Sequence, residues 1–179
     1  MNQATSELRD ANEKLQKISA SDYLTAIGNR RYFENALNET LSKPSDDDIG
    51  IMLLDVDNFK QINDSFGHAA GDYVLTRVAE ELYKATRPGD IIARYGGDEF
   101  VAHFRCNEET LQRRAENLRQ SVENTAFIWK ENKIHVTLSI GILSQKYDPG
   151  ISIDALMSAA DNAMYQSKQT GRNKVSTYH

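Results

Sequence analysis

Two short acidic segments hold the side chains of this 179-residue chain that could carry out metal-dependent chemistry. One is Asp55-Val56-Asp57, which ends the apolar run from Ile49 to Leu54, and the other is Asp98-Glu99, which follows two glycines. Carboxylates at the end of a buried strand are costly unless something compensates them, and a hard divalent cation is the usual compensation. If the two strands are neighbours in a sheet, these segments predict a Mg²⁺ site.

The segment from Arg94 to Phe100 predicts a β-hairpin, because it lies between two apolar, strand-like runs and contains Gly96 and Gly97 at its turn. Glycines also let a ligand approach the backbone closely. Side chains of adjacent residues in an extended chain point to opposite faces, so at most one of Asp98 and Glu99 is expected to face a given metal or phosphate. Taken in isolation, a Gly-Gly-Asp-Glu turn is more often a solvated hairpin that carries two surface acids. Whether this hairpin belongs to a functional site therefore depends on motifs elsewhere in the chain.

Composition and length narrow the class of protein. With 26 acidic and 21 basic residues the formal net charge is −5, which argues against a general nucleic-acid binder and means that an anionic substrate needs local cations or a metal. No apolar run approaches the ~18 residues of a membrane span, and the first twenty residues are too polar for a secretory signal, so we expect a cytoplasmic protein. The single Cys106 can form no internal disulfide and is expected to be a packed strand residue.

The order of the expected elements indicates an α/β (α+β) fold. Helices alternate with strands, but tight hairpins also join strands, which predicts a mixed central sheet with a βαββαβ, palm-like core flanked by helices. We expect a helical linker or stalk over residues 1–20 and a catalytic domain over 21–179. The expected strands are 49–54, 91–93, 100–104, 127–129, 134–142 and, at an edge, 173–177.

The first twenty residues favour a helix with a heptad-like seam. Leu8 and Leu15 lie seven residues apart, as do Ala11 and Ile18. Two heptads are too few for a stable coiled coil. The segment is therefore either a solvated helical lead-in or the end of a stalk that joins the domain to a second copy or to an upstream sensor domain.

Several separated motifs, taken together and in order, closely resemble the GGDEF family of diguanylate cyclases. The resemblance covers the chain from Asp22 to the C-terminus. It departs from the family pattern at Ala26-Ile27 and at Asn58, neither of which is an expected ligand. The motifs are Asp22-Tyr23-Leu24-Thr25, Asp55-Val56-Asp57-Asn58-Phe59-Lys60, Asn63-Asp64, Phe66-Gly67-His68, Gly71-Asp72, Arg94 to Phe100, and Lys168 to Asn173.

The resemblance implies a fold of the nucleotidyl cyclase type and a GTP-dependent enzyme that makes cyclic di-GMP and releases two pyrophosphates. By this match Asp55, the Val56 carbonyl and Asp98 would hold Mg²⁺ or Mn²⁺. Asp98 would act as a metal ligand first and as a general base second, because a bound cation makes a carboxylate a poorer base. Lys60 would neutralise phosphate charge during catalysis and Glu99 would assist.

The family also implies how GTP would be bound. Asn63 and Asp72 would read the guanine, since an amide offers a donor and an acceptor and a carboxylate accepts from the N1 and N2 hydrogens. His68 would lie near the nucleoside. The remaining expected contacts to GTP are Phe59, Gly96, Gly97, Lys168 and Arg172. Without the family, Lys168 and Arg172 could simply complement the C-terminus of their helix.

Each domain of the family holds one GTP, so a productive site would form across a homodimer. Arg87 and Asp90 match the family's inhibitory site for the product cyclic di-GMP, with Arg119 as a candidate extra contact. An alternative function is a catalytically silent module that binds GTP or cyclic di-GMP and signals. A third possibility, a cyclase that makes a mixed guanine–adenine dinucleotide, is disfavoured by Asp72, whose carboxylate should repel the N1 acceptor of adenine.

Overall fold

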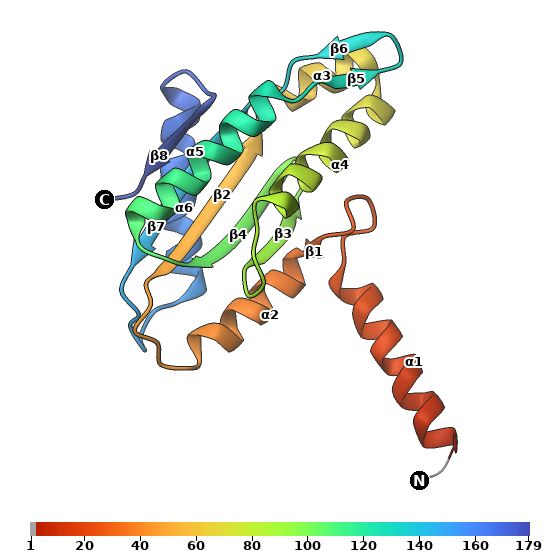
Figure 1. Ribbon diagram of the computed structural model, residues 1–179, viewed down its shortest axis with the longest axis vertical. Helices are drawn as coiled ribbons and strands as arrows, with labels where there is room; N and C mark the ends of the chain where they lie inside the picture. The colour runs from red at the N-terminus through yellow and green to blue at the C-terminus, as the bar shows by residue number, and fades with distance from the viewer. Residues whose placement is uncertain (1–2) are drawn as a thin grey trace.

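The structure is a computed structural model that describes residues 3–179, without the side chains at positions 3, 13 and 16–18. A six-stranded mixed sheet forms its centre (Figure 1), as the sequence predicted. The pairs β2–β4, β2–β7 and β3–β4 are antiparallel, whereas β1–β3 and β7–β8 are parallel. In spatial order the strands are β1 (Gly28–Asn29), β3 (Ile91–Gly96), β4 (Glu99–Arg105), β2 (Ile49–Val56), β7 (Leu138–Gln145) and β8 (Lys174–Thr177).

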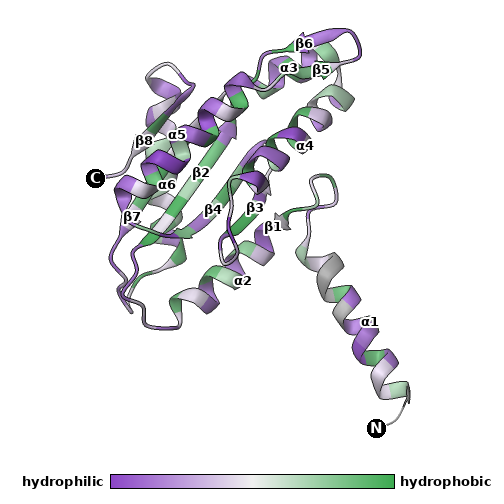
Figure 2. Ribbon diagram, in the orientation of Figure 1, coloured by the Kyte–Doolittle hydropathy of each residue, from purple (hydrophilic) through white to green (hydrophobic). Residues whose placement is uncertain are grey.

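Helices cover both faces of this sheet. Helices α4 (His68–Lys84) and α5 (Glu108–Asn124) pack on one face, and α2 (Arg30–Leu41) and α6 (Ile153–Gln169) pack on the other. Every residue of β2 is buried, because this central strand has a helical layer on each side. Figure 2 shows the same pattern, with apolar strands inside and the polar faces of the helices outside. The apolar residues of β2 therefore pack against the apolar faces of the helices on both sides of the sheet.

Helix α1 (Gln3–Ala20) projects away from the body of the domain (Figure 1). Leu8 and Leu15, on the heptad-like seam, are 74% and 64% exposed. The side chain of Ile18, the other large apolar residue expected there, lies outside the described side chains. Between residues 3 and 179 no helix has both the length and the hydropathy that crossing a membrane requires.

One predicted strand is wrong in its extent. The run 134–142 is divided between β6 (Asn132–Ile134), which pairs with β5 (Phe127–Trp129) in a separate small sheet, and β7 of the main sheet. Residues 135–137 separate the two strands, and the Thr137 carbonyl accepts a hydrogen bond from the Asp57 backbone N–H at 3.0 Å. Alternation of apolar residues continues through this interruption, so the sequence pattern could not reveal it.

Residues 58–66 also differ from the expectation. No strand was expected over these residues and no apolar stripe marks a helix in them, but they contain a short helix, α3 (Phe59–Phe66). Asn58 precedes it in a left-handed conformation with φ of 54°. Ile62 is its one buried residue, so the helix is too short and too polar to give a recognisable apolar stripe.

Candidate active site

The two acidic segments meet at the end of the sheet that lies nearest α3. Strands β2 and β4 are neighbours, with Asp55 opposite Glu99 in the register. One step further, the Val56 N–H donates to the Asp98 carbonyl at 3.2 Å. This juxtaposition confirms the predicted proximity of the two strands and places Asp55, Val56 and Asp98 side by side at their ends.

The surroundings of the Asp55 carboxyl only partly compensate a negative charge on it. Its side chain is buried, and its Oδ1 has no hydrogen-bond partner among the described atoms, while Oδ2 accepts a hydrogen bond from Lys168. Burial, followed by the adjacent Asp98 carboxyl, raises the pKa of Asp55 to about 7 against the lowering effect of Lys168. A divalent cation bound by the two carboxyls would stabilise the ionised form of Asp55 and so offset the effects of burial and of the adjacent Asp98.

The residues present fit Mg²⁺ or Mn²⁺. The donors would be the Asp55 and Asp98 carboxylates and the Val56 carbonyl. Among the described residues, no group of three or more His, Cys, Asp or Glu side chains is placed to hold a metal without further ligands. Mg²⁺ commonly takes one or two carboxylates and completes its shell with water and substrate phosphates. Such an ion would therefore depend on the nucleotide for part of its coordination.

Asp57, the third acidic residue near the strand end, has a different role. Its Oδ1 accepts from the Ser139 hydroxyl at 2.6 Å, and its Oδ2 accepts from the Thr137 hydroxyl at 2.7 Å and the Asn173 N–H at 3.0 Å. Three donors satisfy this buried carboxylate without a cation. It joins the end of β2 to β7 and to the segment before β8.

Helix α6 brings Lys168 to the acidic residues because it lies unusually close to β7. A Cβ on Gly141 would stand 2.2 Å from both the Ala160 carbonyl oxygen and the Met164 nitrogen, so only glycine allows this approach. The Ser167 hydroxyl donates to the Ile140 carbonyl at 2.8 Å and fixes the helix against the strand. Lys168, the next residue, then pairs with Asp55.

The hairpin tip is open and is held from below by Arg94. Gly97 has φ of 50°, and a Cβ at Gly96 or Gly97 would meet nothing within 4 Å, which leaves room for a ligand against the backbone. The Arg94 Nε donates to the Gly97 carbonyl at 2.8 Å, and its Nη1 lies 3.3 Å from Asp22 Oδ2. Glu99 is half-buried beside Lys168, and burial raises its pKa.

Arg94 has a positioning role that was not expected from the sequence. Burial disfavours ionisation of Asp22, but hydrogen bonds from Thr25 and the charge of Arg94 outweigh it and lower the pKa of Asp22. The Asp22-to-Thr25 turn therefore presents a fixed carboxylate to Arg94, which supports the hairpin. The available signal in the sequence was an Asp-x-x-Thr motif together with an arginine two residues before the first glycine.

The expected guanine-reading residues lie where α3 meets α4. The Asn63 side chain packs against Gly71, and its Oδ1 is buried without a hydrogen-bond partner among the described atoms. Asp72 and His68 are exposed on the first turns of α4. Phe59 also approaches Gly71, while Lys60 is exposed on α3. The structure thus gathers this group on one pair of adjoining helices.

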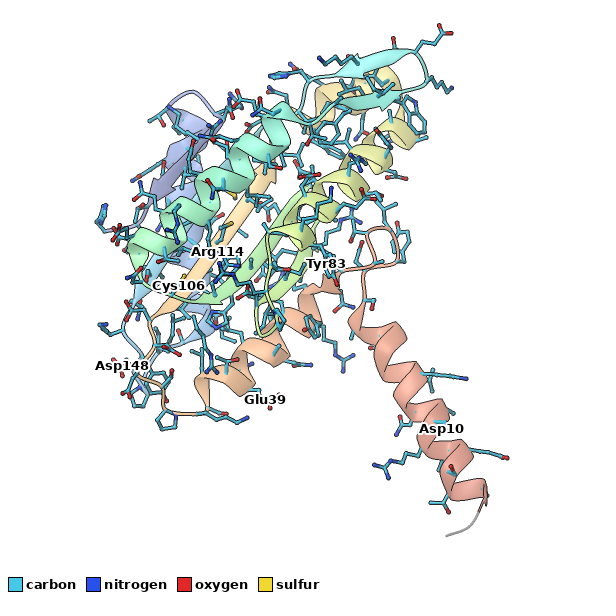
Figure 3. All side chains as sticks on the ribbon, viewed as in Figure 1. Asp10, Glu39, Tyr83, Cys106, Arg114 and Asp148 are labelled. Atoms are coloured by element: carbon cyan, nitrogen blue, oxygen red, sulfur yellow. The ribbon has the colours of Figure 1, made fainter. Side chains whose placement is uncertain are left out.

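The turn between α4 and β3 contains Arg87 and Asp90. The Arg87 N–H donates to Asp90 Oδ2 at 2.8 Å, and Arg114 Nη2 donates to the same oxygen at 2.5 Å. Arg114, which is labelled on α5 in Figure 3, also donates to the Ala85 carbonyl, and its guanidinium lies 4.0 Å from the centre of the Phe104 ring. These contacts join α5 to the turn. The turn borders a cavity of about 810 Å³ to which Ala20 and residues of α2 and α4 also contribute.

Arg119, the expected extra contact at this turn, points elsewhere. Its guanidinium pairs with Glu116 at 2.6 Å and Glu123 at 2.7 Å and donates to Asn173 Oδ1 at 2.7 Å. The structure therefore brings Arg114, rather than Arg119, to Asp90. Arg172, expected at the phosphates, is exposed just before Asn173.

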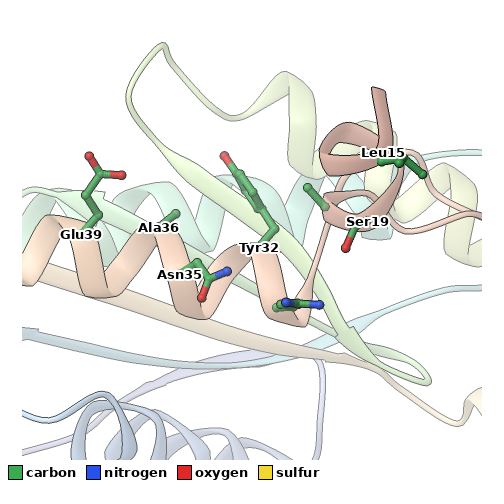
Figure 4. A pocket seen from close by; sticks show the side chains of 8 residues that line it. Leu15, Ser19, Tyr32, Asn35, Ala36 and Glu39 are labelled. Atoms are coloured by element: carbon green, nitrogen blue, oxygen red, sulfur yellow. The ribbon is translucent and has the colours of Figure 1, made fainter. Parts of the chain in front are cut away.

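A second pocket, of about 560 Å³, lies between the end of α1 and α2 (Figure 4). Leu15 and Ser19 line it from α1, and Tyr32, Asn35 and Glu39 line it from α2. None of the residues expected to bind metal or GTP lies in its lining. The chemistry is therefore assigned to the strand ends rather than to this pocket.

Comparison with known proteins agrees with the fold and with these motifs. The family described as "Diguanylate cyclase, GGDEF domain" matches residues 19–174. The chain belongs to this GGDEF-domain family of diguanylate cyclases. It is 38% identical over 170 residues to diguanylate cyclase A of Treponema denticola, covering 92% of this chain and 46% of that protein. It is 36% identical over 157 residues to diguanylate cyclase DgcZ of Escherichia coli, covering 87% and 52%.

Solved structures agree on the fold. The coiled coil and GGDEF domain of DgcB from Caulobacter crescentus, in complex with c-di-GMP, matches with a TM-score of 0.86 and 30% identity, covering 97% of this chain and 93% of that one. SiaD of Pseudomonas aeruginosa, solved with its activator SiaC, matches with the same score and identity over 97% of this chain and 67% of that one. The present chain spans about half the length of the two curated relatives, diguanylate cyclase A and DgcZ.

Proposed function

We propose that this chain condenses two molecules of GTP into cyclic di-GMP with release of two pyrophosphates. The observation that carries the proposal is the buried, partly unpartnered Asp55 carboxyl beside Asp98, with Lys168 on its other oxygen. That arrangement of two acids and a cation suits a metal-bound triphosphate. It supports catalysis more than a silent receptor, which has no need of a metal site.

In this proposal Asp55, the Val56 carbonyl and Asp98 hold Mg²⁺ or Mn²⁺. Held by these residues, the ion would supply charge neutralisation and Lewis-acid polarisation of the triphosphate. Lys60, Lys168 and Arg172 neutralise the charge that shifts toward pyrophosphate. The open backbone at Gly96 and Gly97 lets the nucleotide lie against the hairpin. Positioning and electrostatic stabilisation therefore account for most of the rate.

Proton removal from the 3′-hydroxyl is assigned to Asp98 as a secondary role. Glu99, whose pKa is raised by burial, lies beside Lys168 and assists in shaping the same charge distribution. In this proposal the Asn63 amide and the Asp72 carboxylate read the guanine, and His68 and Phe59 lie near the nucleoside. A carboxylate at position 72 favours guanine over adenine because guanine presents two donors there.

The two half-sites belong to two copies of the chain, since each copy offers one set of nucleotide contacts. Residues 21–179 form the catalytic domain in this proposal, and residues 1–20 form a helical stalk toward the second copy or an upstream sensor domain. The projecting α1 with its exposed Leu8 and Leu15 supports this division. The related DgcB structure contains a coiled coil with its GGDEF domain.

The turn of Arg87 and Asp90 is proposed to bind cyclic di-GMP as a feedback inhibitor. Relatives solved with c-di-GMP support the ligand, and the cavity beside the turn offers space for it. Arg114 replaces Arg119 as the additional arginine, because it already holds the Asp90 carboxylate. A coupling of ~1–3 kcal/mol would give feedback of several-fold to about a hundredfold.

Incubation of the purified chain with GTP and Mg²⁺, with products separated by chromatography and identified by mass, tests the proposed activity. Cyclic di-GMP together with pyrophosphate is the expected result. GTP or cyclic di-GMP binding without any product at high protein concentration would instead favour the silent signalling module. A mixed dinucleotide from GTP and ATP together would overturn the assigned guanine specificity.

A further inference from the structure

The segment that comes after α6 has an unusual backbone for residues with side chains. Gly171, Arg172 and Asn173 have φ values of 116°, 60° and 45°. Left-handed conformations of two consecutive non-glycine residues persist only where the surroundings determine them strongly, and they are concentrated at functional sites. The Arg172 N–H donates to the Ser167 carbonyl at 2.9 Å, which closes the end of the helix but does not hold residue 173.

Three hydrogen bonds hold Asn173 in this conformation. They engage its backbone N–H and both polar atoms of its side-chain amide. Its N–H donates to Asp57 at 3.0 Å, its Nδ2 donates to Glu123 Oε1 at 2.7 Å, and its Oδ1 accepts from Arg119 at 2.7 Å. Arg119 and Glu123 are themselves paired at 2.7 Å on α5. The backbone at 173 is thereby tied to the end of β2, and its side chain to α5.

These contacts surround a residue with a proposed role in GTP binding. Arg172 lies between Gly171 and the fixed Asn173, and Lys168, four residues earlier, pairs with Asp55. We propose that Asn173 is a positioning residue, held by Arg119 and Glu123, that aims Arg172 at the triphosphate of GTP. This inference rests on the proposed function of Arg172, and it gives Arg119 a role in substrate binding rather than in product inhibition.

Asn173→Ala, Arg172→Ala and the double variant, compared with the wild type, test the inference. We expect Asn173→Ala to raise the KM for GTP about tenfold, with a smaller change in kcat, because Arg172 loses its fixed direction. In the Arg172→Ala background the same substitution should change the KM less than twofold. Asn124→Ala, at the exposed end of α5, is the matched control and should leave the KM unchanged.

Conservative replacement separates positioning from simple stability. Glu123→Ala should raise the KM, whereas Glu123→Gln, which retains an acceptor oxygen for Asn173 Nδ2, should restore most of the wild-type value. Urea unfolding of each variant gives the stability. A lowered stability of Asn173→Ala with an unchanged KM would show a merely structural role and overturn the inference, as would a full effect of Asn173→Ala in the Arg172→Ala background.

Binding measurements keep this result distinct from the proposed activity. Dissociation constants for GTP with Mg²⁺, measured by calorimetry on the same variants, report on the network even if the wild type forms no cyclic di-GMP. In that case a weakened affinity in Asn173→Ala supports the positioning role although the cyclase proposal fails. A wild-type chain that does not bind GTP would overturn both.

Discussion

The side-chain amide of Asn63 occupies the space in which a Cβ atom on residue 71 would stand. An ideal Cβ built on Gly71 would lie 1.9 Å from Asn63 Oδ1 and 3.1 Å from Phe59 Cζ. Gly71 is buried in α4, and Asn63 comes from α3, so the absence of a side chain at one helix determines where the amide of the other lies. Gly71, which has no side chain, therefore determines the position of the Asn63 amide, the group that is proposed to read the guanine.

Gly71→Ala is expected to raise the KM for GTP about tenfold, which corresponds to the loss of one hydrogen bond worth ~1–1.5 kcal/mol. The new methyl group meets a flexible side chain rather than backbone, so Asn63 moves and α3 and α4 keep their places. Alanine is favoured over glycine in a helix interior by ~1 kcal/mol, so the free energy of unfolding should not fall by much. Steady-state kinetics with GTP, together with urea unfolding, measure both.

Gly150→Ala is the matched control. Gly150 lies in an exposed loop, where a Cβ would meet only Asp148 Oδ1 at 3.5 Å. This variant should keep the wild-type KM. An unchanged KM in Gly71→Ala as well would show that Asn63 does not read the guanine, or that it reads it from a different position.

Asp55→Asn should reduce turnover by about 10²–10³-fold, because it removes a charged metal ligand at the reacting phosphates. The same substitution should abolish the rise in thermal midpoint that Mg²⁺ gives to the wild type in the presence of GTP, since a ligand that binds only the native state stabilises it. Thermal unfolding with and without Mg²⁺ gives a readout that does not depend on activity. Asp64→Asn, which removes a carboxylate from the exposed surface of α3, should change neither quantity.

The location of the acidic residues was predictable because each acidic segment adjoins a local pattern that identifies a strand or a hairpin. An apolar run that ends in Asp55 identifies a buried strand, and two glycines before Asp98 identify a hairpin. From the sequence, the pairing of β2 with β4 was only a condition of the metal-site prediction, and the register of the two strands meets it. The family motifs then specified residues such as Asn63 and Asp72, whose proximity no periodicity reveals.

Long-range polar contacts were not predictable in the same way. Nothing in the spacing of Arg114 and Arg119 on α5 indicates which of them reaches Asp90, because that depends on how α5 is rotated against the sheet. Leu111, Ala115 and Leu118 define the buried face, and Arg114 lies close enough to its edge to stack on Phe104. Similarly, the Asp57–Asn173 contact joins residues 116 positions apart and has no local signature.

Specific activity should fall on dilution, because one chain carries only one proposed set of nucleotide contacts. A plot of initial rate per mole of chain against protein concentration should rise toward a plateau as dimers form. Analytical ultracentrifugation over the same range should show the midpoint of dimerisation at a similar concentration. A rate per mole that does not depend on concentration, in a chain shown to be monomeric, would contradict the shared site.

Arg114→Ala should weaken inhibition by cyclic di-GMP, as Arg87→Ala should, without lowering the initial rate. Arg114 fixes the Asp90 carboxylate through one short hydrogen bond and is itself held by the Ala85 carbonyl and the Phe104 ring. Loss of these contacts frees the turn and raises the inhibition constant by about tenfold, equivalent to ~1.4 kcal/mol. Inhibition curves at fixed GTP give the constants.

Arg113→Ala, one residue earlier on the exposed part of α5, is the control for Arg114→Ala and should be inhibited like the wild type. Arg119→Ala is expected to change the KM for GTP and not the inhibition constant. The reverse pattern, with inhibition lost in Arg119→Ala and retained in Arg114→Ala, would return the inhibitory role to Arg119.

His103 should make the domain less stable in mild acid. Its ring is buried, its Nδ1 lies 3.0 Å from the Gly50 carbonyl and therefore carries the proton, and its Nε2 is buried without a hydrogen-bond partner among the described atoms. Burial lowers the pKa of His103, so the folded domain keeps the ring neutral at pH values where an unfolded chain protonates it. The free energy of unfolding contributed by this group is therefore complete above pH 6.5 and is lost as the pH falls toward the lowered pKa.

His103→Asn retains a side-chain donor for the Gly50 carbonyl and cannot titrate, so its stability should fall less between about pH 7.5 and about pH 5.5 than that of the wild type. The difference between the two proteins is the quantity to measure, because Asp55 titrates in the same interval with the opposite sign. Its pKa of about 7 means that its contribution is complete below 3.8 and is lost as the pH rises through 7. His179→Asn, at the exposed C-terminus, is the control and should follow the wild type. If the free energy of unfolding of the wild type and of His103→Asn changed equally with pH, the folded domain would protonate the His103 ring as readily as the unfolded chain, which would contradict the prediction.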